Sequence, residues 1–190
     1  MSVAVRPRLA AAAAGQLGMA VALAARAACL PVTDIELKWP NDLVAPDGRK
    51  VGGLLLETLI DADRVSAAVI GIGINVNWRA AEMPGELAGS ATSLGELSGA
   101  PVDRGTLFGR LLDHLAAELS SVEAGHDPVD RYRGVCATLG SGVTVEVGDR
   151  TIVGVAVSID ASGGLVIESE GGIEMVASGE VVRVRPAVPA

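Results

Sequence analysis

Residues 50–78, KVGGLLLETLIDADRVSAAVIGIGINVNW, contain two long apolar runs that are separated by the three residues DAD. Apolar runs joined by so short a polar turn are typical of two paired antiparallel strands. In the second run, Gly71 and Gly73 alternate with isoleucines, so both glycines face the same side of the strand. We expect that side to be open to a flat ligand and the other side to be apolar. The spacing lacks the third glycine and the following helix of a dinucleotide-binding fingerprint.

The stretch LKWPNDLV, residues 37–44, concentrates polar groups in a chain with only 2% aromatic residues. Pro40 fixes its own φ and favours an extended Trp39, so we expect a strand to end there. Asn41 and Asp42 then lie at the strand exit, where ligand-binding groups collect in α/β proteins. An Asx turn, in which Asn41 and Asp42 cap their own backbone, explains the same residues and stays open at this point.

A further polar group stands at the start of the first apolar run, where Lys50 is followed by Gly52 and Gly53. Paired glycines within a strand leave a bare backbone, which suits a site where a ligand lies close to the main chain. A β-bulge beside a solvated lysine is the alternative interpretation.

The rest of the chain predicts helices around this hairpin and a strand-rich C-terminal part. The pattern indicates a strand at SVAVRP, a helix over residues 8–29, a long helix with Asp103 as its N-cap and a short helix after Pro128. After Gly140, the five short runs GVTVEV, RTIVGVAVSI, GGLVIESE, GIEMVAS and EVVRVRP predict a small β-barrel. We therefore place a domain boundary near residue 139.

The composition argues against several classes of function. The 190 residues carry a net charge of −8 and no block of basic residues, which argues against nucleic-acid binding. Cys29 and Cys136 are isolated from each other and from any metal-ligand spacing, so we expect two buried free thiols. The Ala-rich N-terminal region has features of a secretory signal. Because Gln16 and two glycines interrupt its apolar run, we expect a buried helix and no membrane span.

The motifs KWPND, RKVGGLLLE and VIGIGINVN, in this order and at this spacing, resemble those of the biotin–protein ligases. The resemblance extends to the helix over residues 8–29, to RYRGVCATLG and to the C-terminal strands. It implies an α+β fold: a mixed β-sheet with packed helices, similar to class II synthetases, followed by a small SH3-like β-barrel. The corresponding domains are a ligase-like core over residues 1–138 and the barrel over residues 139–186.

The resemblance implies that the protein uses ATP and Mg²⁺ to convert biotin into biotinyl-5'-AMP. It also implies transfer of biotin to a lysine of a carboxyl-carrier domain of acetyl-CoA carboxylase or a related carboxylase. The implied location is the cytoplasm, without nucleic-acid or membrane partners, and a homodimer is allowed.

The resemblance also assigns roles to residues of the three motifs. Lys50 matches a lysine that contacts the biotin carboxyl group and the α-phosphate, and Asp42 matches a residue that places Mg²⁺ or orients the acceptor amine. The remaining matches are Gly53 and Leu55 for biotin, and Lys38, Trp39, Asn41, Gly71, Gly73 and Asn75 for the nucleotide.

One departure from the family pattern is that no Gly- and Arg-rich loop stands upstream of the first predicted strand in this sequence. That loop covers the adenylate in the family, so we expect weak or no ligase activity from residues 1–190 alone. The alternative interpretation is a truncated, non-catalytic relative that acts as an oligomerisation or carrier-binding module. A lipoate ligase is disfavoured by the combination of KWPND, GIGIN and the barrel.

Overall fold

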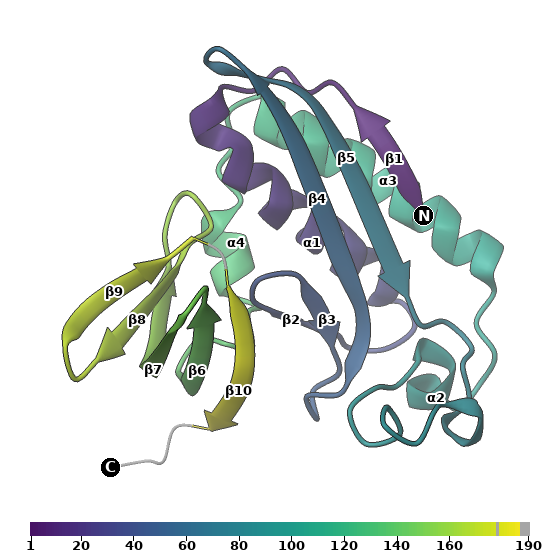
Figure 1. Ribbon diagram of the computed structural model, residues 1–190. Helices are drawn as coiled ribbons and strands as arrows, with labels where there is room; N and C mark the ends of the chain where they lie inside the picture. The colour runs from purple at the N-terminus through teal and green to yellow at the C-terminus, as the bar shows by residue number, and fades with distance from the viewer. Residues whose placement is uncertain (178, 187–190) are drawn as a thin grey trace.

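The computed structural model describes residues 1–177 and 179–186, which form two five-stranded sheets and four α-helices. The larger sheet has the strand order β1-β5-β4-β3-β2, and all its neighbouring strands pair antiparallel. Its strands are β1 (Ser2–Val5), β2 (Glu36–Lys38), β3 (Asp42–Val44), β4 (Lys50–Asp61) and β5 (Arg64–Ile74). The predicted hairpin is confirmed as β4 and β5, the longest pair in Figure 1.

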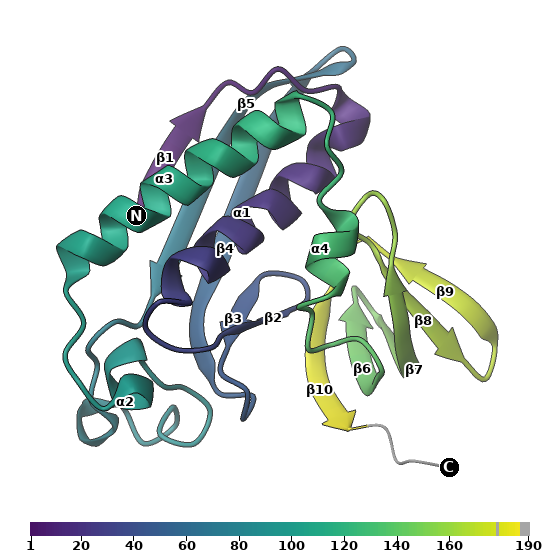
Figure 2. The ribbon, with the colours of Figure 1, turned by 180° about the vertical axis from the view of Figure 1, so that it is seen from behind.

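Two long helices, α1 (Ala14–Cys29) and α3 (Arg104–Glu123), pack side by side on one face of this sheet (Figures 1 and 2). The Asp103 carboxylate accepts a hydrogen bond from the Thr106 backbone N–H, which confirms the predicted N-cap of α3. The helix predicted over residues 8–29 begins later, at Ala14, after a 3₁₀ turn. The shorter elements are the 3₁₀ turns η1 (Ala11–Ala13) and η2 (Ala80–Glu82) and the helices α2 (Leu94–Ser98) and α4 (Val129–Arg133).

The period-two pattern of β5 decides which face of the sheet is covered. Ile70 and Ile72 are buried beneath the helices, whereas Val69 on the same strand is 46% exposed on the opposite face. On β4, Leu55 and Leu59 are also exposed on that opposite face. The sheet therefore has a packed side and a side that is open within the described residues, as the alternation predicted.

The smaller sheet has the strand order β10-β6-β7-β8-β9, also antiparallel, and corresponds to the predicted SH3-like barrel. Its strands are β6 (Ser141–Val147), β7 (Arg150–Ile159), β8 (Leu165–Ser169), β9 (Gly172–Val176) and β10 (Glu180–Pro186). All five match the predicted runs; Ser178, the last residue of the predicted GIEMVAS run, lies outside the described residues. The α+β class is thus confirmed.

One strand, β3, was missed by the sequence analysis. The sequence analysis places Asn41 and Asp42 at a strand exit and predicts no strand after them, but Leu43 is fully buried and pairs with both β2 and β4. Three residues are too few to give a period-two signal. The sheet is antiparallel between its named strands, and parallel pairing occurs in two isolated bridges, Leu37–Cys136 and Lys50–Ala91. The strand-exit rule for parallel sheets therefore does not explain the position of Asp42.

The N-terminal helix and the cysteines lie in the core. The helix over residues 11–29 is long and apolar enough to cross a membrane. However, 56% of an apolar 18-residue stretch within it is buried inside the fold. A core helix passes the same test, so this is weak evidence for a membrane span. Cys29 and Cys136 are buried and free, as predicted, and burial raises the pKa of Cys29 to about 12.

The turn between β7 and β8, residues 160–164, is braced by one carboxylate. Asp160 Oδ1 accepts hydrogen bonds from the backbone N–H and the hydroxyl of Ser162 and from the backbone N–H of Gly164. The Ser162 hydroxyl bond lowers the pKa of Asp160 most, and the backbone donors add to it. This turn is called the β7–β8 turn below.

Replacing Ile70 by Ala should lower the free energy of unfolding by about 3 kcal/mol, because it leaves a cavity beneath the helices. Replacing the adjacent Val69, on the open face, by Ala should lower the free energy of unfolding by only about 0.5 kcal/mol. Urea unfolding followed by circular dichroism measures both changes. Equal losses for the two variants would contradict the assignment of the packed face.

Replacing Asp160 by Ala should lower the free energy of unfolding at neutral pH by about 1 kcal/mol. A carboxyl with a lowered pKa stabilises the fold above its unfolded pKa of about 3.9 and loses this effect as the pH falls. The difference from wild type should therefore shrink between about pH 5 and pH 3 in urea unfolding. A difference that is constant with pH would contradict this role, and a Glu170→Ala variant in the next turn serves as the control.

Candidate functional site

The antiparallel register brings the three sequence motifs together at the centre of the larger sheet. Asp42 on β3 is the cross-strand partner of Gly53 on β4, and Gly53 is the partner of Gly73 on β5. Leu55 and Gly71 form a neighbouring pair. These residues surround an open hollow of about 380 Å³, called the glycine hollow below. It is lined by Met1, Asn41, Asp42, Lys50, Gly53, Leu54, Leu55, Gly71, Ile72 and Gly73.

The charged side chains of the glycine hollow form one ion pair. Lys50 Nζ lies 2.6 Å from Asp42 Oδ1, and the two side chains are 50% and 20% exposed. An exposed pair contributes little to stability because water screens it. The arrangement therefore holds a half-exposed ammonium group beside the glycines, where it can meet an anionic ligand.

The glycines of β4 and β5 differ in what they leave room for. A Cβ atom at Gly52 would lie 2.4 Å from the carbonyl oxygen of Gly73, so this glycine is required by backbone packing. A Cβ atom at Gly73 would meet only the Gly53 oxygen, at 3.8 Å, and one at Gly71 would touch Leu55 at 3.4 Å. Gly71 and Gly73 are therefore not required by packing, and their bare backbone forms the floor of the glycine hollow.

Asn41 fixes one wall of the glycine hollow. Its side-chain Nδ2 donates to the Leu54 carbonyl oxygen at 2.8 Å, and its own carbonyl oxygen accepts from the Leu54 backbone N–H at 2.8 Å. The predicted alternative, in which Asn41 and Asp42 only cap their own turn, does not describe these contacts, because both side chains reach β4.

Trp39 reaches the smaller sheet through its indole N–H, and it also lines a cavity of about 330 Å³ together with Asn41, Asp42 and Lys50. The side chain is 2% exposed, and its indole N–H donates to the Gly163 carbonyl oxygen at 2.9 Å. The Trp39 backbone N–H donates to the Thr138 hydroxyl at 2.9 Å. The nucleotide contact expected for Trp39 stays a prediction, while the structure gives this side chain a partner in the protein.

Two other predicted residues lie at the margin of the glycine hollow. Lys38 is the register partner of Asp42 and lines a neighbouring cavity of about 330 Å³ together with Asn41, Asp42 and Lys50. Asn75 follows β5, and its Nδ2 donates to the Thr92 carbonyl oxygen at 3.0 Å. The roles expected for Lys38 and Asn75 toward nucleotide stay predictions.

The loop after β5 supports the Lys50 backbone, which sequence reasoning missed. The Lys50 N–H donates to the Ser90 carbonyl oxygen at 2.8 Å, and the Thr92 N–H donates to the Lys50 carbonyl oxygen at 2.9 Å. In the sequence, the one feature that indicated this contact was the pair of polar residues just after β5, Asn75 and Asn77. Lys50 is thus held from a segment forty residues away in the sequence.

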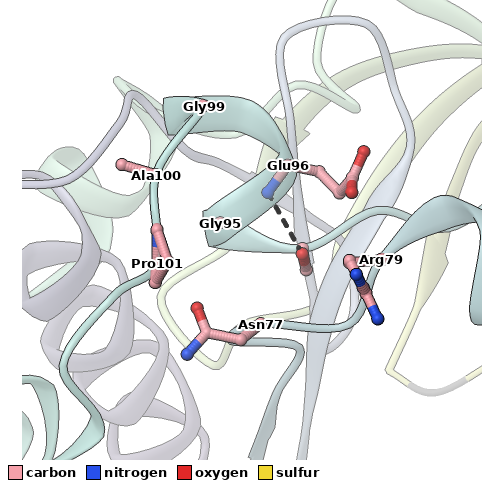
Figure 3. Close-up of a pocket in the computed structure, with 8 residues that line it drawn as sticks. Asn77, Arg79, Gly95, Glu96, Gly99, Ala100 and Pro101 are labelled. Carbon is pink, nitrogen blue, oxygen red and sulfur yellow. Dashed lines mark hydrogen bonds between the residues drawn. The ribbon is translucent and has the colours of Figure 1, made fainter.

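A second cavity, of about 480 Å³, lies within this loop region (Figure 3). Two of its polar side chains have partners: the Asn77 amide exchanges two hydrogen bonds with the Val102 backbone, and Arg79 pairs with Glu82. The dashed line in Figure 3 is the N-cap bond of α2, from the Glu96 N–H to the Ser93 hydroxyl. This cavity contains none of the predicted site residues.

Comparisons with known proteins find relatives for most of the chain. Residues 2–75 match the family model described as the biotin/lipoate A/B protein ligase family, and residues 138–184 match the biotin protein ligase C-terminal domain. The biotin–[acetyl-CoA-carboxylase] ligase of Paracoccus denitrificans is 30% identical over 185 residues, which cover 93% of this chain and 76% of the relative. The ligase of the same name from Mycobacterium tuberculosis is 35% identical, over 82% of this chain.

The chain spans about half the length of several curated relatives: 56% of the Mycobacterium tuberculosis protein and 45% of the bifunctional ligase/repressor BirA of Bacillus spizizenii. The crystal structure of the biotin protein ligase from Aquifex aeolicus superimposes with a TM-score of 0.81 and 29% identity, covering 98% of this chain and 81% of that one. The chain therefore belongs to the family of biotin–protein ligases.

Proposed function

We propose that this chain carries the catalytic core of a biotin–protein ligase, which uses ATP to form biotinyl-5'-AMP and then transfers biotin to a carrier lysine. The observation that carries the proposal is the Lys50–Asp42 pair beside a floor of glycines, in a member of this family. An Aquifex aeolicus relative of 29% identity and TM-score 0.79 was solved in complex with biotin and ATP, which supports both as substrates.

In the first step, a carboxylate oxygen of biotin attacks the α-phosphorus of ATP, and pyrophosphate leaves with the electrons of the broken P–O bond. Both reactants are anionic, so a fixed cation lowers the barrier. Lys50 supplies this cation because its ammonium group is half-exposed at the glycine hollow. Without ligand its charge is balanced by Asp42, and we infer that the incoming carboxylate or phosphate replaces Asp42 as its partner.

In the second step, the amine of the acceptor lysine attacks the acyl carbon, the bond to the phosphate oxygen breaks, and AMP leaves. The attacking amine loses its proton to solvent, and Asp42 is placed to orient the amine once Lys50 has the ligand as its partner. Asp42 also fits the alternative role as a Mg²⁺ ligand. Mg²⁺ that enters with ATP needs only one or two protein carboxylates, besides the phosphates and water.

The remaining residues form the binding surface. We assign biotin to the backbone beside Gly53 and Leu55, and the nucleotide to the side that contains Gly71 and Gly73, with Asn41 and Lys38 at the margin. The indole N–H of Trp39 and one side-chain N–H of Asn75 are bonded to other parts of the protein. We therefore propose that these two residues support the site and do not read the ligand through those groups.

The acceptor that we propose is a carboxyl-carrier domain, since relatives are named biotin–[acetyl-CoA-carboxylase] ligases. We place the reaction in the cytoplasm, where ATP is supplied. The net charge of −8 provides no electrostatic basis for a nucleic-acid partner.

A non-catalytic module for oligomerisation or carrier binding is the second candidate. The exposed apolar side chains of Leu55, Leu59 and Val69 on the open face of the larger sheet favour it, because such a face suits a protein partner. The two candidates differ in whether the chain binds biotin and ATP and joins them.

Replacing Lys50 by Gln should slow the formation of biotinyl-5'-AMP about 100-fold, because a charge that stabilises the transition state is lost. Replacing the adjacent Arg49, which pairs with Asp47 in the preceding turn, should change the rate less than about twofold. The rate of biotinyl-5'-AMP formation, even when it is slow, is measured by mass spectrometry in single-turnover reactions with the protein in excess. Wild-type protein that binds neither substrate and forms no adenylate would support the non-catalytic module instead.

Replacing Gly73 by Ala should leave the midpoint of thermal unfolding unchanged, because the new methyl group has only ordinary contacts. The methyl group projects into the glycine hollow and should weaken biotin or ATP binding about tenfold in isothermal titration calorimetry. The contrasting Gly52→Ala variant should be destabilised by its clash with the Gly73 carbonyl. Normal affinity in a folded Gly73→Ala protein would show that ligands bind elsewhere.

A further inference from the structure

The β7–β8 turn of the smaller sheet packs directly against the backbone of helix α1. A Cβ atom at Gly15 would lie 1.7 Å from the Ser162 carbonyl oxygen, and one at Gly163 would lie 3.5 Å from the Gly15 oxygen. The two main chains therefore touch with no space for a side chain at Gly15. Close contact of this kind fixes the distance between the turn and the helix.

The same turn holds Trp39. The Gly163 carbonyl oxygen accepts the indole N–H at 2.9 Å, and the indole is almost fully buried. Only Pro40 separates Trp39 from Asn41, and Asp42 follows Asn41 directly. Asn41 is bonded to Leu54 on β4, and Asp42 is paired with Lys50. A displacement of the Trp39 indole would therefore be transmitted to the Asp42–Lys50 ion pair through only two or three residues of the main chain.

The β7–β8 turn is itself rigidly braced. Asp160 accepts three hydrogen bonds within the turn. Arg133 on α4 donates from Nε to the Ile159 carbonyl oxygen at 2.8 Å, just before the turn. Helix α4 lies between the helices of the larger sheet and the smaller sheet in Figure 2. The turn is thus fixed from two sides and can hold Trp39 in one position.

We infer that the β7–β8 turn is a positioning element for the glycine hollow and that Trp39 is a positioning residue that acts through Asn41 and Asp42. Through this turn the smaller sheet then contributes to catalysis by positioning residues of the larger sheet. Because small displacements of reacting groups reduce rates strongly, the effect of losing this contact should exceed its effect on stability. The expected effect on the reaction rate rests on the proposed function, whereas the positioning of residues 38–44 does not.

The Gly15→Ala variant should test this inference, with Gly18→Ala as its matched control. Both substitutions add one methyl group to the same helix and raise its helix propensity. The methyl group at Gly15 must displace the β7–β8 turn, whereas that at Gly18 meets only Leu56 Cδ2 at 3.7 Å. In amide hydrogen exchange, Gly15→Ala should increase the exchange of residues 38–44 about tenfold over Gly18→Ala, with β5 unchanged in both.

The catalytic consequence is measured with the same proteins. Gly15→Ala should form biotinyl-5'-AMP about 10- to 100-fold more slowly than Gly18→Ala at saturating substrates. The Trp39→Phe variant keeps an aromatic ring but loses the indole donor. It should also show faster exchange at residues 38–44 and slower adenylation, and it replaces Gly15→Ala in this test if that variant does not fold.

Equal exchange at residues 38–44 in Gly15→Ala and Gly18→Ala would overturn the inference, as would increased exchange with an unchanged rate of adenylation. A wild-type protein that binds neither biotin nor ATP and forms no adenylate would instead overturn the proposed function. In that case the exchange comparison still decides whether the β7–β8 turn positions residues 38–44.

Discussion

The site depends on the close approach of bare backbone where β3, β4 and β5 pair. Gly52 admits no side chain because the Gly73 carbonyl occupies that space, so the two long strands pair in this register only with glycine at position 52. The register in turn places Asp42, Gly53 and Gly73 in one row across the sheet. A shift of one residue would move the glycines to the packed face and destroy both the core and the hollow.

A second constraint is that the charged pair is held from outside the central strands. Lys50 is tied through its backbone to residues 90–92, and Asp42 follows a segment that Trp39 anchors in the smaller sheet. The exposed ion pair itself contributes little to stability, so its geometry must come from these backbone ties. Rigid support of exposed functional groups by buried neighbours is a general requirement of precise sites.

Much of this arrangement could be predicted from the sequence. The hairpin, the five C-terminal strands and the N-cap at Asp103 follow from local patterns, and the structure confirms them. The gathering of Lys50, Asp42 and the glycines was expected from the resemblance, and local patterns indicated only that each segment was unusual. The β3 strand was missed because three residues carry too little periodicity.

The contacts between distant segments could not be predicted. Nothing local in the sequence indicates that Trp39 donates to Gly163, 124 residues away, or that Gly15 faces Ser162. The division of the chain at residues 138 and 139 also stays a prediction, since one cluster of buried side chains includes members of both sheets.

The central claim is that ligands bind over the glycine floor of the larger sheet. The most direct measurement is a ¹H–¹⁵N NMR titration of the whole chain with biotin and a non-hydrolysable ATP analogue, in which the glycine amide signals are resolved and assigned. The account predicts shifts at Gly53, Gly71 and Gly73, with small changes at Gly95 and Gly99 in the second cavity. Shifts confined to Gly95 and Gly99, or no shifts at saturating ligand, would contradict it.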